Sequence, residues 1–286
     1  MKKSISPLRY PGGKAKLYDR IKEILEKNKL TNKVYIEPFA GGCGLALLLL
    51  RNNMVDSLVL NDLDRSIYAF WYSILNYTDE FCNLIISTEI TLEVREKQKL
   101  IQKEKETADL LELGFSTFFL NRVNHSGVIK GGPIGGLKQE GKYKLDCRFN
   151  KTRLIEQIKE IVSYKEKIRV TNLDVMEFIN NELPTLPKDS FVFLDPPYYK
   201  KGPGLYVNFY KHEDHQNLAK EIINKIEQNW IVTYDNVEEI KEIYKDCNQQ
   251  EFSITYTLKN KGKNSGSEVI IFKENLEINF EEKVEK

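Results

Sequence analysis

The sequence predicts an α/β fold: a mostly parallel β-sheet with helices on its faces, an antiparallel hairpin near the C-terminal end and one inserted segment. Short apolar runs recur between longer amphipathic stretches, which is typical of buried parallel strands that alternate with covering helices. The last two apolar runs follow each other across the loop KNKGKNSG, as the strands of a hairpin do. A chain of 286 residues has room for one large α/β domain and a sizeable insertion.

Seven apolar runs have the length and composition of strands. They lie at residues 33–39, 57–61, 167–172, 190–195, 229–235, 251–258 and 267–273. Amphipathic stretches predict helices at residues 43–53, 64–76, 174–181, 213–227 and 237–246.

Residues 78–165 interrupt this alternation. Helices are expected at about 91–113 and 151–164, and the part between them is rich in Gly, Lys and Asn, with too few apolar residues for a core of its own. We therefore interpret residues 78–149 as an inserted domain of helical and β-hairpin character, and residues 1–77 and 150–286 as the main domain.

The charges of the chain are segregated along the sequence. Lys and Arg nearly balance Asp and Glu, for a formal net charge of +1. Residues 115–153 nevertheless carry a local charge of +6, and residues 1–20 carry +5. Such segregation suits a face that meets phosphates, although a solvated loop would also explain it.

Several classes of protein are disfavoured by the composition. The four cysteines form no C-x-x-C pair, which argues against disulfides and a structural zinc site. His212 and His215 lack an obvious third ligand, so surface or capping roles are expected for them and no metal is predicted. No apolar run has the length of a membrane span, and the first residues lack the apolar core of a signal peptide. A cytoplasmic protein is therefore expected.

The stretch YIEPFAGGCG places Glu37 and a glycine-rich turn between a strand and a helix. Glycines in such a turn let a ligand approach the backbone and the helix N-terminus. The spacing lacks a full G-x-G-x-x-G, so a NAD site is weakly supported, and a plain tight turn is an alternative.

Acids also follow the next two strands. Asp62 ends the second strand, where a carboxylate is a natural acceptor for ribose hydroxyls. Asp64 is a candidate helix cap, whereas Asn172 and Asp174 follow the third strand as either a cap or a contact to an adenine edge. Together these strand ends indicate a ligand that contains adenosine.

The stretch FVFLDPPYY runs from a buried strand directly into Asp195. Pro196 and Pro197 have no N–H, so this backbone offers carbonyl acceptors with few competing donors. Acceptors alone suit a substrate that donates, such as an exocyclic amine, and Tyr198 adds a flat face for a base. The segment predicts a grip on the amino group of a flipped-out nucleobase.

Four motifs, RYPGGK, EPFAGGCG, NDLD and DPPYY, occur in this order along nearly the whole chain. In these motifs the sequence resembles the Dam-related D12 class of DNA adenine-N6 methyltransferases, with the insertion placed as in the α-type arrangement. The resemblance implies a Rossmann-like S-adenosylmethionine-dependent methyltransferase sheet with an inserted DNA-recognition domain. It also implies methyl transfer from S-adenosylmethionine to N6 of a flipped-out adenine in duplex DNA. The insertion is less similar to Dam, so GATC specificity does not follow.

The resemblance also implies roles for single residues. The family's N-terminal aromatic and lysine fall on Tyr10 and Lys14, and its ribose-binding acid falls on Asp62. The full set expected at the cofactor is Tyr10, Lys14, Glu37, Phe39, Gly41, Gly42, Asp62, Asp174 and Asp195. Asp195, Pro196 and Tyr198 are the expected catalytic residues, because the Asp195 carboxylate and the Pro196 carbonyl accept hydrogen bonds from the N6 amine.

Duplex DNA is the expected partner, and a restriction endonuclease that acts on the same site is a possible second one. Residue types that hydrogen-bond bases cluster in the stretch NRVNHSG. The residues expected on DNA are Arg9, Asn121, Arg122, Asn124, His125, Lys130, Lys138 and Lys142.

Alternatives to this function share parts of the pattern. Cytosine-N4 methylation uses the same grip on an amine, although a serine is then typical at position 195. Cytosine-C5 chemistry needs a cysteine nucleophile, usually after a proline, and none of the cysteines follows one. Methylation of RNA or of a glutamine amide fits the basic insertion less well, as does an adenosine-nucleotide enzyme without DNA. A catalytically silent DNA-binding protein of the same fold is the alternative from another class.

Overall fold

A computed structural model describes residues 5–10, 12–200, 210–256 and 264–278. The chain divides into two compact units. Unit 1 comprises Met1–Tyr18, Ala40–Asn52 and Leu58–Leu173, and unit 2 comprises Asp19–Phe39, Asn53–Ser57 and Asp174–Lys286. The predicted inserted domain, residues 78–149, lies within unit 1, and its separate role stays a prediction.

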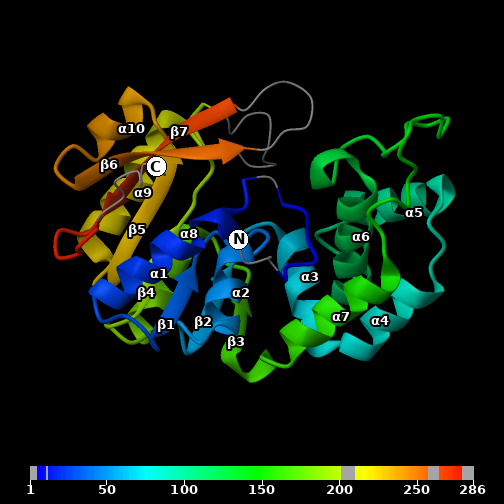
Figure 1. Cartoon of the computed structure of the whole chain (residues 1–286), viewed down its shortest axis with the longest axis horizontal. Coiled ribbons are helices and arrows are strands. Elements are labelled where there is room, and N and C mark those ends of the chain that lie inside the picture. The colour runs from blue at the N-terminus through cyan, green and yellow to red at the C-terminus, as the bar shows by residue number, and fades with distance from the viewer. Residues whose placement is uncertain (1–4, 11, 201–209, 257–263, 279–286) are drawn as a thin grey trace, which may run out of the picture. The chain divides into compact units, whose positions relative to one another are not determined.

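Seven strands form one mixed sheet in the order β3-β2-β1-β4-β5-β7-β6 (Figure 1). They are β1 (Val34–Glu37), β2 (Ser57–Asn61), β3 (Ile168–Thr171), β4 (Phe191–Leu194), β5 (Asn229–Asp235), β6 (Asn248–Tyr256) and β7 (Asn264–Phe272). The order 3-2-1-4-5 is that of doubly wound nucleotide-binding sheets. All seven predicted strands are therefore confirmed, except that residues 257–258 lie outside the described part of the chain.

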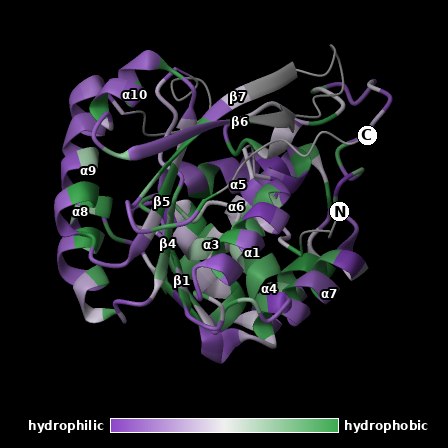
Figure 2. Cartoon of the chain, turned by 60° about the vertical axis from the view of Figure 1, so that its left-hand side comes forward, coloured by the Kyte–Doolittle hydropathy of each residue, from purple (hydrophilic) through white to green (hydrophobic). Residues whose placement is uncertain are grey.

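Unit 2 contributes β1, β4 and β5, with β4 parallel to both of the others, and the antiparallel pairs β5–β7 and β6–β7. The predicted C-terminal hairpin is confirmed. The helices of unit 2 are α1 (Tyr18–Lys27), α8 (Val175–Glu177), α9 (His212–Lys225) and α10 (Glu238–Ile243). Figure 2 shows hydrophobic residues along β4 and β5 and mostly hydrophilic ones on α9 and α10, as expected of a buried parallel sheet covered by amphipathic helices.

Unit 1 holds the parallel pair β2–β3 and most of the helices. These are α2 (Gly44–Arg51), α3 (Arg65–Asn76), α4 (Thr78–Ser87), α5 (Leu92–Lys103), α6 (Leu110–Val123) and α7 (Lys151–Val162). The helix expected at 91–113 is two helices, because the side chain of Asp109 accepts from the N–H groups of Leu111 and Glu112 and starts a new one. The sequence did not predict α1 or α4, and only three residues of the helix expected at 174–181 are α-helical, before a π-helical turn at Phe178–Glu182.

The expectation that residues 115–149 lack apolar residues for a core is wrong at its start. Residues 115–123 belong to α6, whose side chains are almost all buried. Gly114 lets α6 approach α3, since a Cβ there would lie 2.5 Å from the carbonyl oxygen of Ala69. Phe118 stacks on Phe70 of α3 with ring centroids 6.0 Å apart, and it meets Phe81 of α4 at 5.6 Å. This part of the predicted insertion therefore shares a core with α3 and α4.

The expected β-hairpin of the insertion is reduced to a single antiparallel bridge between Asn124 and Pro133. The rest of residues 124–149 consists of turns and short helical turns, all of them described. Among the described helices, none is long and apolar enough to cross a membrane.

Candidate active site and nucleic-acid interface

The glycine turn of unit 1 lies directly under Tyr10. A Cβ at Gly41 would lie 2.7 Å from Cε1 of Tyr10, and one at Gly42 would lie 2.6 Å from the Tyr10 Cβ. Gly41 also has φ +49°, in the left-handed region that favours glycine. The turn ends at the N-terminus of α2, where unpaired N–H groups suit a polar ligand. Only glycines leave room for both the turn and the aromatic ring above it.

Asp62 is tied to this turn by its carboxylate. Oδ2 accepts from the N–H of Gly41 at 2.8 Å, and Oδ1 accepts from the N–H of Asp64 at 2.9 Å. Burial raises the pKa of Asp62 to about 7, although the two backbone donors act in the opposite direction. Each oxygen of a carboxylate has two acceptor positions, so both oxygens can still accept from a diol.

Asparagines at the ends of β2 and β3 support the backbone beside Asp62. The amide nitrogen of Asn61 donates to the carbonyl of Leu173 at 3.0 Å, and its amide oxygen accepts from the N–H of Leu173 at 2.9 Å. Asn172 donates to the carbonyl of Asp62 at 2.7 Å. Asp64 accepts from the N–H of Ser66 at the start of α3, so the predicted cap is confirmed.

Lys14 begins a short 3₁₀ turn and is 7% exposed. Its ammonium donates to the carbonyl of Gly12 at 3.2 Å. Its role at the cofactor stays a prediction of the resemblance.

Four expected cofactor residues, Glu37, Phe39, Asp174 and Asp195, belong to unit 2. Glu37 ends β1, is buried, and accepts from the Tyr35 hydroxyl at 3.1 Å. Phe39 meets Tyr210 edge to face, with centroids 6.5 Å apart. Asp174 caps α8, because its Oδ1 accepts from the N–H of Met176 at 2.8 Å. The cap alternative for Asp174 is thus confirmed, and its contact with a cofactor stays a prediction.

The DPPYY segment begins where the fully buried strand β4 ends. Asp195 is half-buried, and its Oδ1 accepts from the Thr233 hydroxyl of β5 at 2.9 Å. Pro196 is buried and Tyr198 is 6% exposed. The strand end therefore presents a carboxylate beside a backbone without N–H donors, as the sequence predicts.

A second acid holds the end of this segment. Asp235, 4% exposed at the end of β5, accepts from the backbone N–H groups of Tyr199 and Lys200 at 2.9 and 3.0 Å. Sequence reasoning missed both Thr233 and Asp235. The sequence feature that could have indicated them is the presence of a threonine and an aspartate near the end of the otherwise mostly apolar strand NWIVTYD.

His215 is a correction to the expected surface role. The side chain is fully buried, its Nδ1 lies 3.1 Å from the Tyr234 hydroxyl, and its ring lies 5.1 Å from that of Tyr199. Burial lowers the pKa of His215 to about 4, which keeps the ring neutral. His212 is exposed in the first turn of α9, with Nδ1 3.0 Å from the Tyr199 hydroxyl. Among the described residues, no group of three or more His, Cys, Asp or Glu side chains is placed to hold a metal ion.

The asparagines expected on DNA are engaged inside the protein. Asn121 accepts from the N–H of Arg9 at 2.7 Å and donates to the carbonyl of Gly127 at 2.8 Å. Asn124 is fully buried, accepts from Nε of Arg95 at 2.8 Å and donates to the carbonyl of Ile129 at 2.8 Å. These amides hold the loop after α6, so we assign them to its shape.

Arg122 is likewise engaged by carbonyl groups. Its guanidinium donates to the carbonyls of Arg148, at 2.7 Å from Nε, and of Pro7, at 3.2 Å. Burial and the neighbouring cations Arg9, Arg153 and Arg148 lower its pKa to about 10. The sequence predicts Arg122 on DNA, whereas the structure shows it joining the N-terminal segment to the loop that ends at Phe149.

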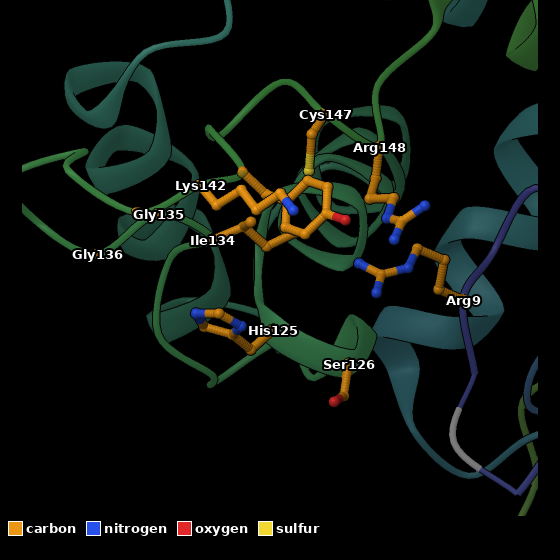
Figure 3. Close-up of a pocket in the computed structure, with 11 residues that line it drawn as sticks. Arg9, His125, Ser126, Ile134, Gly135, Gly136, Lys142, Cys147 and Arg148 are labelled. Carbon is orange, nitrogen blue, oxygen red and sulfur yellow. The ribbon is translucent and has the colours of Figure 1, made fainter. Parts of the chain in front are cut away.

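A cavity of about 370 Å³ lies beside this loop (Figure 3). Its lining includes Arg9, His125, Lys142, Tyr143, Cys147 and Arg148, and none of its described lining residues is acidic. Figure 3 shows the guanidinium groups of Arg9 and Arg148 side by side. Burial, followed by the charge of Arg148, lowers the pKa of Arg9. Adjacent like charges favour an anion between them. Lys130 and Lys138 are exposed and do not line the cavity.

Comparison with known proteins gives a family match for most of the chain. The model described as D12 class N6 adenine-specific DNA methyltransferase matches residues 10–260. The chain is 22% identical over 207 residues to the Type II methyltransferase M.MjaIII of Methanocaldococcus jannaschii, an alignment that covers 67% of this chain and 68% of that protein.

Two solved structures show a distant likeness. The SAM-dependent methyltransferase from Agrobacterium tumefaciens has 10% identity and a TM-score of 0.39, with 89% of this chain and 61% of that one covered. The rRNA methyltransferase aviRa from Streptomyces viridochromogenes has 13% identity and a TM-score of 0.39, with 92% and 86% covered. At these scores the likeness carries no argument about function.

Proposed function

The chain belongs to the D12 class N6 adenine-specific DNA methyltransferase family, and from this premise we propose which of its residues carry out the reaction. Its activity is the transfer of a methyl group to N6 of adenine in DNA. The observation that supports the assignment of the catalytic group is the position of Asp195, a carboxylate at the end of the fully buried strand β4, next to two prolines without N–H groups.

S-Adenosylmethionine, when bound, supplies an electrophilic methyl group on a sulfonium. The glycine turn under Tyr10 fits such a cofactor, because it ends at the N-terminus of α2, whose N–H groups suit a polar ligand. Asp62 would accept hydrogen bonds from the two ribose hydroxyls. We propose that these residues of unit 1, with Lys14, bind the cofactor, and the cofactor roles of Glu37, Phe39, Asp174 and Asp195 stay predictions of the resemblance.

The N6 lone pair of adenine is delocalised into the ring and is therefore a weak nucleophile. Hydrogen bonds from N6–H to the Asp195 carboxylate and the Pro196 carbonyl would favour a tetrahedral nitrogen, whose lone pair can attack the methyl carbon in line. N6 would form the new C–N bond as the methyl group leaves the sulfonium sulfur, and N6 would then lose one proton to water. A base held this way must leave the duplex, so we propose that the adenine is flipped out. Stacking of the base on Tyr198 stays a prediction.

We propose that the cationic cavity contacts the DNA backbone. Arg9, Lys142 and Arg148 converge on it without a described acidic neighbour in the lining, which suits a phosphate. His125 also lines the cavity and can reach the same partner. Lys130 and Lys138 are exposed on the same loop and would add weaker phosphate contacts. We also propose a restriction endonuclease that acts on the same site as a partner, since the matched relative is named a Type II methyltransferase.

Nucleoside mass spectrometry of methyl-free DNA, incubated with the protein and S-adenosylmethionine, tests the activity and its assignment. We expect N6-methyladenine from the wild type and none from Asp195→Ala, with cofactor and DNA binding retained in part. Asp189→Ala is the matched control, because this nearby acid has an exposed side chain that pairs with Lys33 at the surface. Full activity of Asp195→Ala would refute the catalytic role, and N4-methylcytosine as the product would overturn the substrate base.

A further inference from the structure

Two polar side chains at the end of β5 have no role in the chemistry described so far. Thr233 is fully buried and Asp235 is 4% exposed, in a strand whose other residues up to Tyr234 are mostly apolar. Burying polar groups costs free energy unless they are hydrogen-bonded. Both side chains form hydrogen bonds with the segment that begins at Asp195.

We propose that Thr233 and Asp235 are positioning residues for methyl transfer, which together hold the two ends of the segment from Asp195 to Lys200. This inference rests on the proposed catalytic role of Asp195. Neither residue needs to touch the substrate, because each acts through the segment that it binds.

The strand register explains why Thr233 meets Asp195. Phe193 pairs with Ile231 and Leu194 with Val232 in the parallel ladder of β4 and β5. One step further along both strands, Asp195 comes beside Thr233, and the hydroxyl donates to Oδ1 at 2.9 Å. A hydrogen bond from a hydroxyl to a carboxylate is stronger than one between neutral groups. Because a β-branched side chain is restricted at χ1, the donor is held rigidly in place.

Asp235 lies two residues further along the same strand, so its side chain leaves the same face as that of Thr233. Its two carboxylate oxygens accept from consecutive N–H groups, those of Tyr199 and Lys200. These bonds fix the backbone just after Tyr198. The direction of the Asp195 carboxylate and the path of the following turn are thus both set by one rigid strand.

Positioning matters here because misplacement of about 1 Å can cost roughly a hundredfold in rate. The Asp195 carboxylate must face the N6 amine while the attack runs in line. Rotation of the carboxylate would weaken the hydrogen bond that draws the nitrogen out of conjugation. Several other residues are proposed to bind the cofactor and DNA, so binding depends far less on this alignment.

The test compares Thr233→Val with Thr233→Ser. Valine keeps the volume and loses the hydroxyl, whereas serine keeps the hydroxyl and loses a methyl group. In single-turnover assays we expect Thr233→Val to transfer the methyl group at least about tenfold more slowly, and Thr233→Ser to stay within about threefold of the wild type. Dissociation constants for S-adenosylmethionine and DNA should stay within about twofold for both variants.

A role in packing alone predicts the opposite order, since serine leaves a small cavity and valine does not. A Thr233→Val rate equal to that of the wild type, or a Thr233→Ser rate as slow as that of Thr233→Val, would overturn the inference. Asp235→Asn gives an independent arm, because its amide nitrogen cannot accept from a backbone N–H. It should also slow transfer more than it weakens binding, and unchanged transfer would contradict the proposal at that end of the segment.

Failure of the inference differs from failure of the proposed function. A wild-type protein that makes no N6-methyladenine would refute the function itself. A wild-type protein that makes it, with Thr233→Val equally fast, would leave the function intact and remove only the role of Thr233.

Discussion

Asp62 combines partial burial with two backbone hydrogen bonds, and this sets how it should respond to pH. Its pKa of about 7 lies above its ordinary value of 3.8, so between these two values the folded protein holds a proton that the unfolded chain has lost. The contribution of Asp62 to stability therefore falls as pH rises from about 4 to 7. Binding of ribose hydroxyls should instead strengthen as pH rises, because the ionised carboxylate accepts hydrogen bonds better than the protonated one does.

We therefore predict that the affinity for S-adenosylmethionine rises as pH increases from 6 to 8. The expected gain is on the order of tenfold between pH 6 and the plateau, since a protonated carboxyl must first ionise. Calorimetric titration at several pH values measures it. The cofactor has an amino group that also titrates near pH 8, so Asp62→Asn is the necessary control. The same pH dependence in Asp62→Asn would show that Asp62 is not the titrating group.

The sequence predicts the role of a residue when that role depends on its neighbours along the chain. Asp195 follows a strand that is recognisable by itself, and Gly41 and Gly42 lie in a turn whose spacing is visible in the chain. Asn124 has a type suited to DNA, yet its burial depends on Arg95, which is distant in sequence. The role of Thr233 likewise depends on a strand register that no local pattern reveals.

At the scale of elements, α6 is a helix that sequence periodicity predicts only at its start. Its residues FSTFFL are buried on nearly every side. A helix that is apolar all round has no polar stripe and therefore little helical periodicity. The short apolar runs of the strands and the amphipathic pattern of α7 and α9 are easier to recognise, which is why these elements were predicted close to their bounds.

The burial of α6 predicts a large loss of stability on truncation of its aromatic side chains. Phe118 is fully buried against Phe70 and Phe81. We expect Phe118→Ala to lower the free energy of unfolding by about 3–5 kcal/mol. Leu100→Ala is the control on α5, because Leu100 is 57% exposed, and it should change stability by less than about 0.5 kcal/mol. Equal midpoints of urea unfolding for the two variants would contradict the shared core.

At the scale of the whole molecule, strand order and charge follow from different information. The alternation of strands and helices predicts a doubly wound sheet, and the observed order 3-2-1-4-5 agrees with it. The net charge of +1 conceals the basic segments, residues 1–20 and 115–153. Folding brings both of them to one cavity in unit 1, through Arg9 from the first and through Lys142 and Arg148 from the second. Neither segment alone reveals this convergence.

A cavity that contacts phosphates predicts a measurable dependence of DNA binding on salt. Each phosphate neutralised on duplex DNA contributes a slope of about −0.9 to the logarithmic dependence of affinity on salt concentration. Lys142→Ala should therefore flatten that slope by about one contact and weaken all sequences alike. Fluorescence anisotropy with labelled duplexes at several salt concentrations measures it. Lys188→Ala is the matched control, since Lys188 is an exposed lysine of unit 2 that pairs with Glu227. If the two variants change the slope equally, the effect comes from overall charge; if Lys142→Ala leaves it unchanged, the cavity does not bind the backbone.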